Sequence, residues 1–243
     1  MRTLQRALGI LEIFSSERPS LSLQEIAERG GLAKSTAFRL VAALAESGYL
    51  LRLDDQRYCL SFRFTRLAAL VQSTLSVRDV ARPLMQALCD RTGETVTLNA
   101  VEGRYRICLD VVCAMSPLMS VTRTGARSPL VDGASARVLM ARLSEPQRGR
   151  VITAAARACH QPRASFAREI EIVARRGWAV THGERVAGLT AVAALVGDAD
   201  GTWPWCLTVA GPTVRLQPRE RELVRLVQQA AASASRQMGA PLA

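Results

Sequence analysis

Apolar side chains recur at helical spacing through the first third of the chain, and from Glu94 they follow the alternation typical of strands. The first segment has apolar residues at Leu4, Ala7, Leu8 and Leu11, with an acid following them. This spacing predicts an amphipathic helix over residues 3–15 rather than a secretory signal peptide. We therefore expect a mature cytoplasmic protein.

The stretch SLQEIAERGGLAKSTAFR, which begins at Ser22, predicts two helices joined by a tight turn. Ser22 and Glu25 have the spacing of a capping box for a first helix over residues 23–29. A glycine pair ends that helix, and a second helix begins at Lys34 and extends to about Ser47. Such a pair is either a simple αα-hairpin or a helix-turn-helix whose second helix enters a DNA major groove.

The start of the second helix favours DNA. Exposed helix starts usually carry acids, which complement the helix dipole. Here the first turn offers Lys34, Ser35 and Thr36, with Arg39 one turn further on. Hydroxyl and basic side chains suit phosphates and base edges. We predict that these four residues contact DNA together with Ser22.

Two strand-like runs, YLLRL and RYCLS, follow around a polar DDQ turn and predict a β-hairpin. A hairpin directly after a helix-turn-helix is a wing. Arg52 and Arg57 flank its tip, where they would reach the DNA backbone or minor groove. The alternative is a solvated hairpin with incidental arginines.

Residues 62–74 have helical periodicity and contain neither Gly nor Pro, which predicts a stiff linker helix. Ser76 and Asp79 then cap the next helix, which Gly93 ends. Pro83 falls inside this helix and is expected to kink or loosen it.

Strands and helices are mixed in the remaining chain. Helical segments lie between Pro129 and Arg176, and a final helix is predicted over 218–238 with Pro218 at its first position. We expect strands in the runs TVTLNAV, YRICLDVVC, LMSVTRT, WAVTHGE, LTAVAALVG and WCLTVAG. The sequence thus predicts an α+β protein with a DNA-binding domain (1–61), a linker helix (62–75) and a sensor domain (76–243).

The chain is strongly basic, with 243 residues, a formal net charge of +11 and an isoelectric point near 10.5. This balance favours polyanionic partners. Residues 1–75 hold ten basic and seven acidic side chains, and residues 76–243 hold twenty-two and fourteen. Because the excess is spread along the chain, charge alone does not locate a DNA-binding face.

Other chemistry finds little support. The six cysteines form no CxxC pair and His160 and His182 lie far apart, so we expect reduced structural thiols, no metal site and no cofactor. No GxSxG, HExxH or phosphate loop is present. An enzyme domain fused to a DNA-binding module remains an alternative, as does an architectural nucleic-acid binder held by charge. No apolar run is long enough for a membrane span.

Several segments together resemble one family. The winged-helix domain of IclR-family bacterial transcription regulators is similar to one long run of this chain, ALGILEIFSSERPSLSLQEIAERGGLAKSTAFRLVAALAESGYLLR. Four later runs resemble that family's effector-binding domain and occur in the expected order. They are VARPLMQALCDRTGETVTL, SPLVDGASARVLMA, RRGWAVTHGERVAGLTAVAA and LTVAGPTVRLQP. The resemblance implies a GAF-like sensor domain and a ligand-responsive regulator. For such a regulator we expect a homodimer or homotetramer on a palindromic double-stranded DNA operator, since half-sites mirror the symmetry of the protein.

The resemblance also places an effector pocket between the loop 130–137, the strands from 178 to 194 and the strand 207–210. Small residues there bring backbone N–H groups to a helix start, which can hold a carboxylate without a basic side chain. Close helix–sheet packing also needs small residues and is the alternative. The expected effector-binding residues are Met119, Leu130, Gly133, Ala134, Ser135, Thr181, Ala191, Thr208 and Ala210.

The chain departs from the family pattern at several pocket positions. Thr181 stands where members that bind small keto acids tend to carry an acid, and Ala191 stands in place of a cysteine. Ala210 replaces a hydroxyl residue, and Ala136-Arg137 replaces a Gly-Lys pair. These changes predict a more apolar pocket and an effector with a larger apolar body, such as an aromatic acid.

Overall fold

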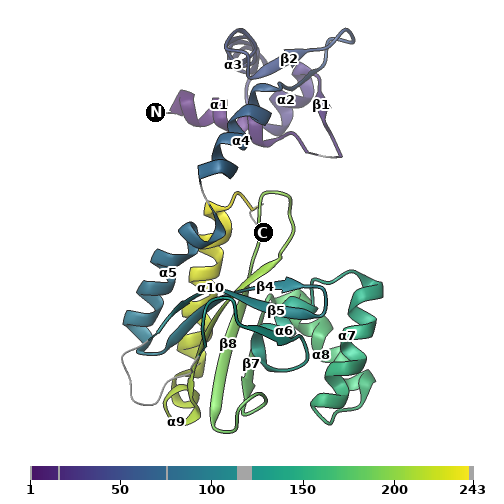
Figure 1. Ribbon diagram of the computed structural model, residues 1–243. Coiled ribbons are helices and arrows are strands. Elements are labelled where there is room, and N and C mark those ends of the chain that lie inside the picture. The colour runs from purple at the N-terminus through teal and green to yellow at the C-terminus, as the bar shows by residue number, and fades with distance from the viewer. Residues whose placement is uncertain (1, 16, 75, 114–121, 241–243) are drawn as a thin grey trace. The chain divides into compact units, whose positions relative to one another are not determined.

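The computed structural model describes residues 2–15, 17–74, 76–113 and 122–240. The chain forms two compact units, residues 1–75 (the N-terminal unit) and 76–243 (the C-terminal unit). Among the described residues, no helix is both long and apolar enough to cross a membrane. Figure 1 labels most of the helices and strands.

The N-terminal unit is a small helical domain with a three-stranded sheet. Helices α1 (Arg2–Glu12), α2 (Leu23–Arg29) and α3 (Lys34–Glu46) pack around a core that includes Ile10, Ile26 and Val41. The antiparallel sheet has the order β1-β3-β2, and helix α4 (Arg63–Thr74) follows it. The strands are β1 (Ser20–Leu21), β2 (Leu50–Arg52) and β3 (Tyr58–Leu60).

Local signals in the sequence produce the helix-turn-helix as expected. The Ser22 Oγ accepts from the Glu25 N–H at 3.2 Å, and the Glu25 carboxylate accepts from the Ser22 N–H at 2.7 Å. Gly31 adopts φ +59°, a left-handed conformation that favours glycine. The capping box, the turn and the β2–β3 wing are therefore confirmed, whereas strand β1 was not predicted.

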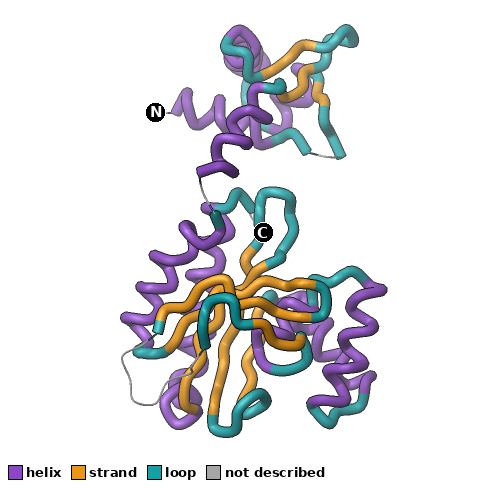
Figure 2. The backbone as a smooth tube through the Cα atoms, in the orientation of Figure 1, coloured by secondary structure: helices purple, strands orange, loops and turns teal. Residues whose placement is uncertain are grey.

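The C-terminal unit is built on a six-stranded antiparallel sheet, drawn in orange in Figure 2. Its strand order is β6-β5-β4-β9-β8-β7. The long neighbours β4, β9 and β8 place residues 95–100, 205–212 and 189–196 side by side. The strands are β4 (Thr95–Glu102), β5 (Tyr105–Val112), β6 (Arg127–Pro129), β7 (Trp178–His182), β8 (Leu189–Val196) and β9 (Trp205–Pro212).

Helices cover both faces of this sheet. Helices α5 (Val77–Thr92) and α10 (Glu220–Gln237) bury one face in a core that includes Val96, Val192 and Leu207. The other face packs against α6 (Gly133–Met140), α7 (Glu145–Ala158) and α8 (Arg163–Arg176). The α+β class is confirmed, and each face has its own apolar core.

Three local predictions concern Pro218, the segment LMSVTRT and Pro83. The final helix does not begin at Pro218, because that residue lies in a 3-10 turn (Gln217–Arg219) that follows the short helix α9 (Thr213–Leu216) and precedes α10. The predicted strand in LMSVTRT falls largely outside the described residues, and the strand that pairs with β5 is β6 instead. Pro83 lies within α5, which is one continuous helix.

Candidate functional site

The outer face of α3 carries the residues predicted to contact DNA. Lys34, Ser35 and Arg39 are exposed and Thr36 is half-buried, while the opposite side of the helix packs into the core. Ala33 precedes the helix without a side-chain cap, and the first turn holds no acid. The helix start thus presents backbone N–H groups and cationic or hydroxyl side chains on one surface.

Phe38 belongs to this surface and was missed by the sequence analysis. Its side chain is 57 % exposed, four residues after Lys34 and next to Arg39. The ring lies on the outer face of α3, away from the buried Ala37, Leu40 and Val41. Such a ring suits the methyl group of thymine in a major groove. The interruption of the apolar periodicity at this position was the available signal.

The two arginines of the wing have different partners. The Arg52 guanidinium contacts Gln56 and lies 6.0 Å from the Tyr58 ring, on an exposed strand. The Arg57 guanidinium instead donates to the Ser20 carbonyl at 2.9 Å and pairs with Glu25 at 2.9 Å. Arg57 therefore connects the wing to β1 and to the first turn of α2 through a hydrogen bond and an ion pair.

Ser22 has a structural contact of its own, because its hydroxyl caps α2. Its side chain is half-buried at the helix start. Separate hydrogen bonds from Ser22 to the Glu25 carboxylate, first from its backbone N–H and then from its side chain, lower the pKa of Glu25 below its ordinary value. Any contact between Ser22 and DNA would therefore involve a residue already engaged within the domain.

A pocket of about 320 Å³ lies in the C-terminal unit between the start of α6 and the sheet. Strands β4, β5, β7, β8 and β9 and the β7–β8 loop contribute its walls. Seven predicted residues line it: Gly133, Ala134, Ser135, Thr181, Ala191, Thr208 and Ala210. Leu130 does not, because it is buried and lines a separate hollow beside α7. Met119 lies outside the described residues.

Small residues bring α6 close to the sheet. All eight residues of this helix are buried, and it contacts β7, β8 and β9. Gly133 begins the helix with φ +80°, where a side chain would be strained. A Cβ there would also lie 3.7 Å from the Arg106 guanidinium. The small residues at the start of α6 thus serve both close helix–sheet packing and an open pocket, the two interpretations that the sequence left open.

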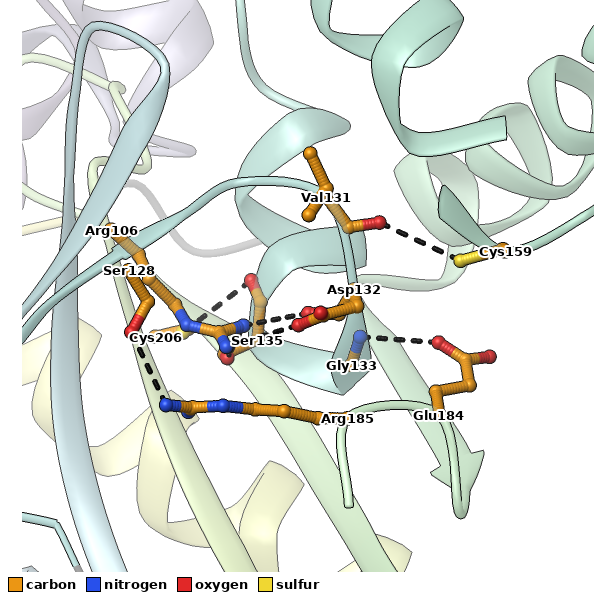
Figure 3. Close-up of polar contacts among 10 residues, drawn as sticks. All are labelled: Arg106, Ser128, Val131, Asp132, Gly133, Ser135, Cys159, Glu184, Arg185 and Cys206. Atoms are coloured by element: carbon orange, nitrogen blue, oxygen red, sulfur yellow. Dashed lines mark hydrogen bonds and ion pairs between the residues drawn. The ribbon is translucent and has the colours of Figure 1, made fainter. Parts of the chain in front are cut away.

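The pocket contains a buried cation that the sequence analysis missed. Arg106 on β5 is only 3 % exposed, and its Nη1 donates to the Asp132 carbonyl at 2.7 Å and to the Ser135 hydroxyl at 2.9 Å. Burial lowers the pKa of Arg106, nearby Arg185 lowers it further, and Asp132 opposes the shift. Figure 3 shows these side chains around the start of α6.

The sequence pattern of β5 does not mark Arg106 as buried, because most of the apolar residues of this strand occupy the half-buried positions. Residues of β5 alternate between half-buried and buried, and Arg106 occupies a buried position in that alternation. A charged residue at an inward position of a strand is rarely incidental, because an isolated buried charge is costly. Thr97, Asn99, Thr122 and Arg185 also line the pocket, so it is more polar than the sequence predicted.

A second charged cluster lies on the other side of Gly133. Glu184, from the β7–β8 loop, accepts from the Gly133 N–H at 3.1 Å and pairs with Arg137 Nη2 at 2.5 Å. Arg137 Nη1 lies 2.7 Å from Glu169 of α8, and the guanidinium stacks over Phe166 at 4.8 Å. Burial by itself would lower the pKa of Arg137. The contacts with Glu184 and Glu169 have the larger effect, so the pKa of Arg137 is raised. This cluster joins α6, α8 and the loop.

The thiols near the pocket are poor nucleophiles. Cys206 is fully buried beneath α6, and burial raises its pKa to about 12. Burial also raises the pKa of Cys108 and Cys159. Within the described residues, no group of three or more His, Cys, Asp or Glu side chains is placed to hold a metal ion. The pocket is therefore suited to binding through hydrogen bonds and charge.

The two units define a class of protein. A winged helix-turn-helix with an exposed basic helix start, followed by an α+β unit with a small pocket, is typical of a transcription regulator that binds both DNA and a small molecule. Residues 3–54 match the IclR helix-turn-helix domain, and residues 69–236 match the family described as bacterial transcriptional regulator IclR C-terminal. The chain belongs to the IclR family.

Individual relatives agree along the whole chain. The HTH-type transcriptional regulator KipR of Bacillus subtilis is 26 % identical, over 98 % of this chain and 97 % of KipR. The crystal structure of an IclR-type regulator from Silicibacter sp. TM1040 superposes with a TM-score of 0.89 at 24 % identity, covering 100 % of this chain and 98 % of that one.

A third relative was crystallised with a ligand. An IclR homologue of Microbacterium hydrocarbonoxydans, complexed with 4-hydroxybenzoate, has a TM-score of 0.59 at 22 % identity and covers 97 % of this chain and 98 % of that one. At this identity the likeness concerns the fold. The family and these relatives are transcription regulators, so the chain is a DNA-binding regulator with a C-terminal effector domain and not an enzyme.

Proposed function

We propose that this regulator binds a palindromic operator as a homodimer or homotetramer, in the cytoplasm, and that an aromatic organic acid controls that binding. The observation that carries the proposal is the pocket between α6 and the sheet. It lies in the effector domain and combines apolar side chains with hydroxyl and guanidinium groups, which can hold the ring and the charged group of an organic acid.

The size and lining of the pocket support a small ring-bearing ligand. A volume of about 320 Å³ lies at the lower end of the usual range for ligand pockets, which suits a single ring with one or two substituents. Val186, Leu189 and Ala191 supply apolar contacts, and Ala210 leaves room beside β9. Thr181 and Thr208 supply hydroxyl groups without adding negative charge. The homologue that holds 4-hydroxybenzoate is consistent with this class of ligand.

The winged helix-turn-helix supports the proposal of a palindromic operator. Dimers of such proteins bind two half-sites about one helical turn apart, so the symmetry of the operator mirrors that of the protein. The effector then shifts the population of DNA-competent arrangements, by no more than its differential affinity for them.

One experiment tests both parts of the proposal. An operator is selected from a random DNA pool with the full-length protein, and its affinity is measured with benzoate, 4-hydroxybenzoate, pyruvate or glyoxylate present. We expect a palindromic consensus, and a change in operator affinity with the aromatic acids. Calorimetry on the same protein should detect binding of an aromatic acid. Tight binding of pyruvate or glyoxylate, with none of the aromatic acids, would contradict the effector class.

A further inference from the structure

The polar end of the effector pocket is cationic. Arg106 from β5 and Arg185 from the β7–β8 loop both line the pocket. Asp132 is the carboxylate that faces Arg106, at 3.4 Å from Nη2, and its own side chain is 30 % exposed. A charge-assisted hydrogen bond is normally about 2.7–2.9 Å long, so Asp132 compensates this buried cation weakly.

Arg185 adds positive charge without a carboxylate partner. Its guanidinium donates to the hydroxyl of Ser128 on β6 at 3.2 Å, which is a neutral contact. In the described part of the chain, no Asp or Glu lies within ion-pair distance of Arg185. Figure 3 shows Arg185 extending beneath the Arg106–Ser135–Asp132 cluster. Two guanidinium groups therefore lie at the pocket with one weakly placed carboxylate.

The backbone donor at the start of α6 is already occupied by an acid of the chain itself. The Gly133 N–H, one of the backbone donors that the sequence offers to a carboxylate, already donates to Glu184. Arg137 holds Glu184 in place, and Arg137 is itself fixed between Glu169 and the Phe166 ring. An effector carboxylate at this amide would have to displace an acid that belongs to the chain and would meet its negative charge.

We propose that Arg106 is the residue that recognises the effector's carboxylate, with Arg185 beside it and the Ser135 hydroxyl completing the contact. This inference deepens the proposed function, on which it rests, by naming the group that selects an anion. A carboxylate bound there gains charge-assisted hydrogen bonds from guanidinium groups. A neutral analogue of the same shape leaves the guanidinium without that partner.

The test compares an acid with its amide in full-length protein. Benzoate and benzamide have nearly the same shape, and only benzoate carries a charge at pH 7. By calorimetry, the wild-type protein should bind benzoate about 10- to 100-fold more tightly than benzamide, since a hydrogen bond to a charged group contributes about 1.5–3 kcal/mol. Arg106→Gln should remove this preference, so that benzoate and benzamide bind with similar affinity, while Arg106→Lys should restore part of the preference.

Arg104→Gln is the matched control, because Arg104 is exposed on the same hairpin and lies outside this pocket. It should leave the preference intact. If Arg106→Gln does not fold, the affinities for benzoate and benzamide are compared in the wild-type protein and in Arg185→Gln. Loss of Arg185 should narrow the preference for benzoate over benzamide.

Two results would overturn the inference. Equal binding of benzoate and benzamide by the wild-type protein would remove the role of charge, while leaving an aromatic effector in place. A full preference for benzoate in Arg106→Gln would assign recognition to another group. If neither compound binds, the aromatic effector of the proposed function fails as well, so the two failures can be told apart.

Discussion

Arg52 and Arg57 lie five residues apart on the wing, and their contacts assign them different tasks. Arg57 joins β3 to the Ser20 carbonyl and to Glu25, so its guanidinium stabilises the domain. Arg52 contacts only its own hairpin, through Gln56 and Tyr58, in the contacts that the structure describes. Both residues were equal candidates in the sequence, because the spacing around the turn is symmetric and says nothing about a partner 37 residues away, such as Ser20.

The expected consequence is a separation of stability from DNA affinity. Arg57→Ala should lower the free energy of unfolding of the N-terminal unit by about 1 kcal/mol, since it removes hydrogen bonds that are partly exposed. Arg52→Ala should leave unfolding nearly unchanged and weaken operator binding. Denaturant unfolding and fluorescence anisotropy on both variants measure the two effects. An unchanged unfolding midpoint for Arg57→Ala would show that its contacts contribute nothing to the fold.

The pocket shows which site residues a sequence can reveal. Gly133, Ala134 and Ser135 were predicted because a run of small residues before an apolar helix is a local signal. Arg106 lies on a strand about thirty residues earlier in the chain, and it reaches the same pocket only through the pairing of β4, β5 and β9. Its burial depends on these long-range neighbours.

At the scale of the element, α2 illustrates how a local signal fixes a helix start. The capping box satisfies N–H groups that the first turn would otherwise leave without partners. Ser22→Ala should therefore lower the free energy of unfolding of the N-terminal unit by about 1 kcal/mol. The affinity of the folded protein for its operator should stay within a fewfold of the wild-type value if the hydroxyl acts only as a cap. Thermal unfolding and DNA titration of the same preparation distinguish the two roles.

The Glu25 half of the capping box gives this prediction a pH dependence. Hydrogen bonds from Ser22, with the nearby charge of Arg57, lower the pKa of Glu25 in the folded state. A lowered pKa means that ionised Glu25 stabilises the fold above its unfolded pKa, and that this contribution is lost as pH falls through the folded pKa. The stability difference between wild-type protein and Glu25→Ala should therefore be largest near pH 7 and shrink in acid. Unfolding curves at pH 7, 5 and 3 measure it, and a constant difference would contradict the assignment.

Elements with their own local signals were predicted, and those defined by their neighbours were not. Helices α2 and α5 begin at capping boxes and end near glycines, so their bounds followed from residue type. Strand β1 has two residues and exists only because β3 pairs with it. Pro218 begins a 3-10 turn because the short helix α9 precedes it, a continuation that helix propensity alone does not predict.

At the scale of the whole molecule, the charge of +11 acts on any polyanion, while the helix-turn-helix acts on a sequence. Most of the excess lies in residues 76–243, so general attraction to DNA does not depend on α3 alone. Sequence preference should depend on the exposed start of α3, where Lys34, Ser35, Phe38 and Arg39 lie together.

Salt titrations separate the two contributions. For a residue that contacts phosphate, replacement by Ala should weaken binding to operator and random DNA equally and reduce the salt slope by about 1. For a residue that reads a base, replacement should cost about 1–3 kcal/mol on the operator and much less on random DNA. We expect Arg39→Ala to behave as the base reader and Lys34→Ala as the phosphate contact, because only arginine offers a planar bidentate fork.

Arg175→Ala is the control for lost charge, since Arg175 is exposed on α8 in the other unit. It should change neither sequence preference nor operator affinity by more than a fewfold. If both α3 variants bind the operator as tightly as wild-type protein at physiological salt, α3 is not the recognition helix. If the wild-type protein shows a steep salt dependence without preference among sequences, charge alone holds the DNA, and the architectural alternative describes the protein better.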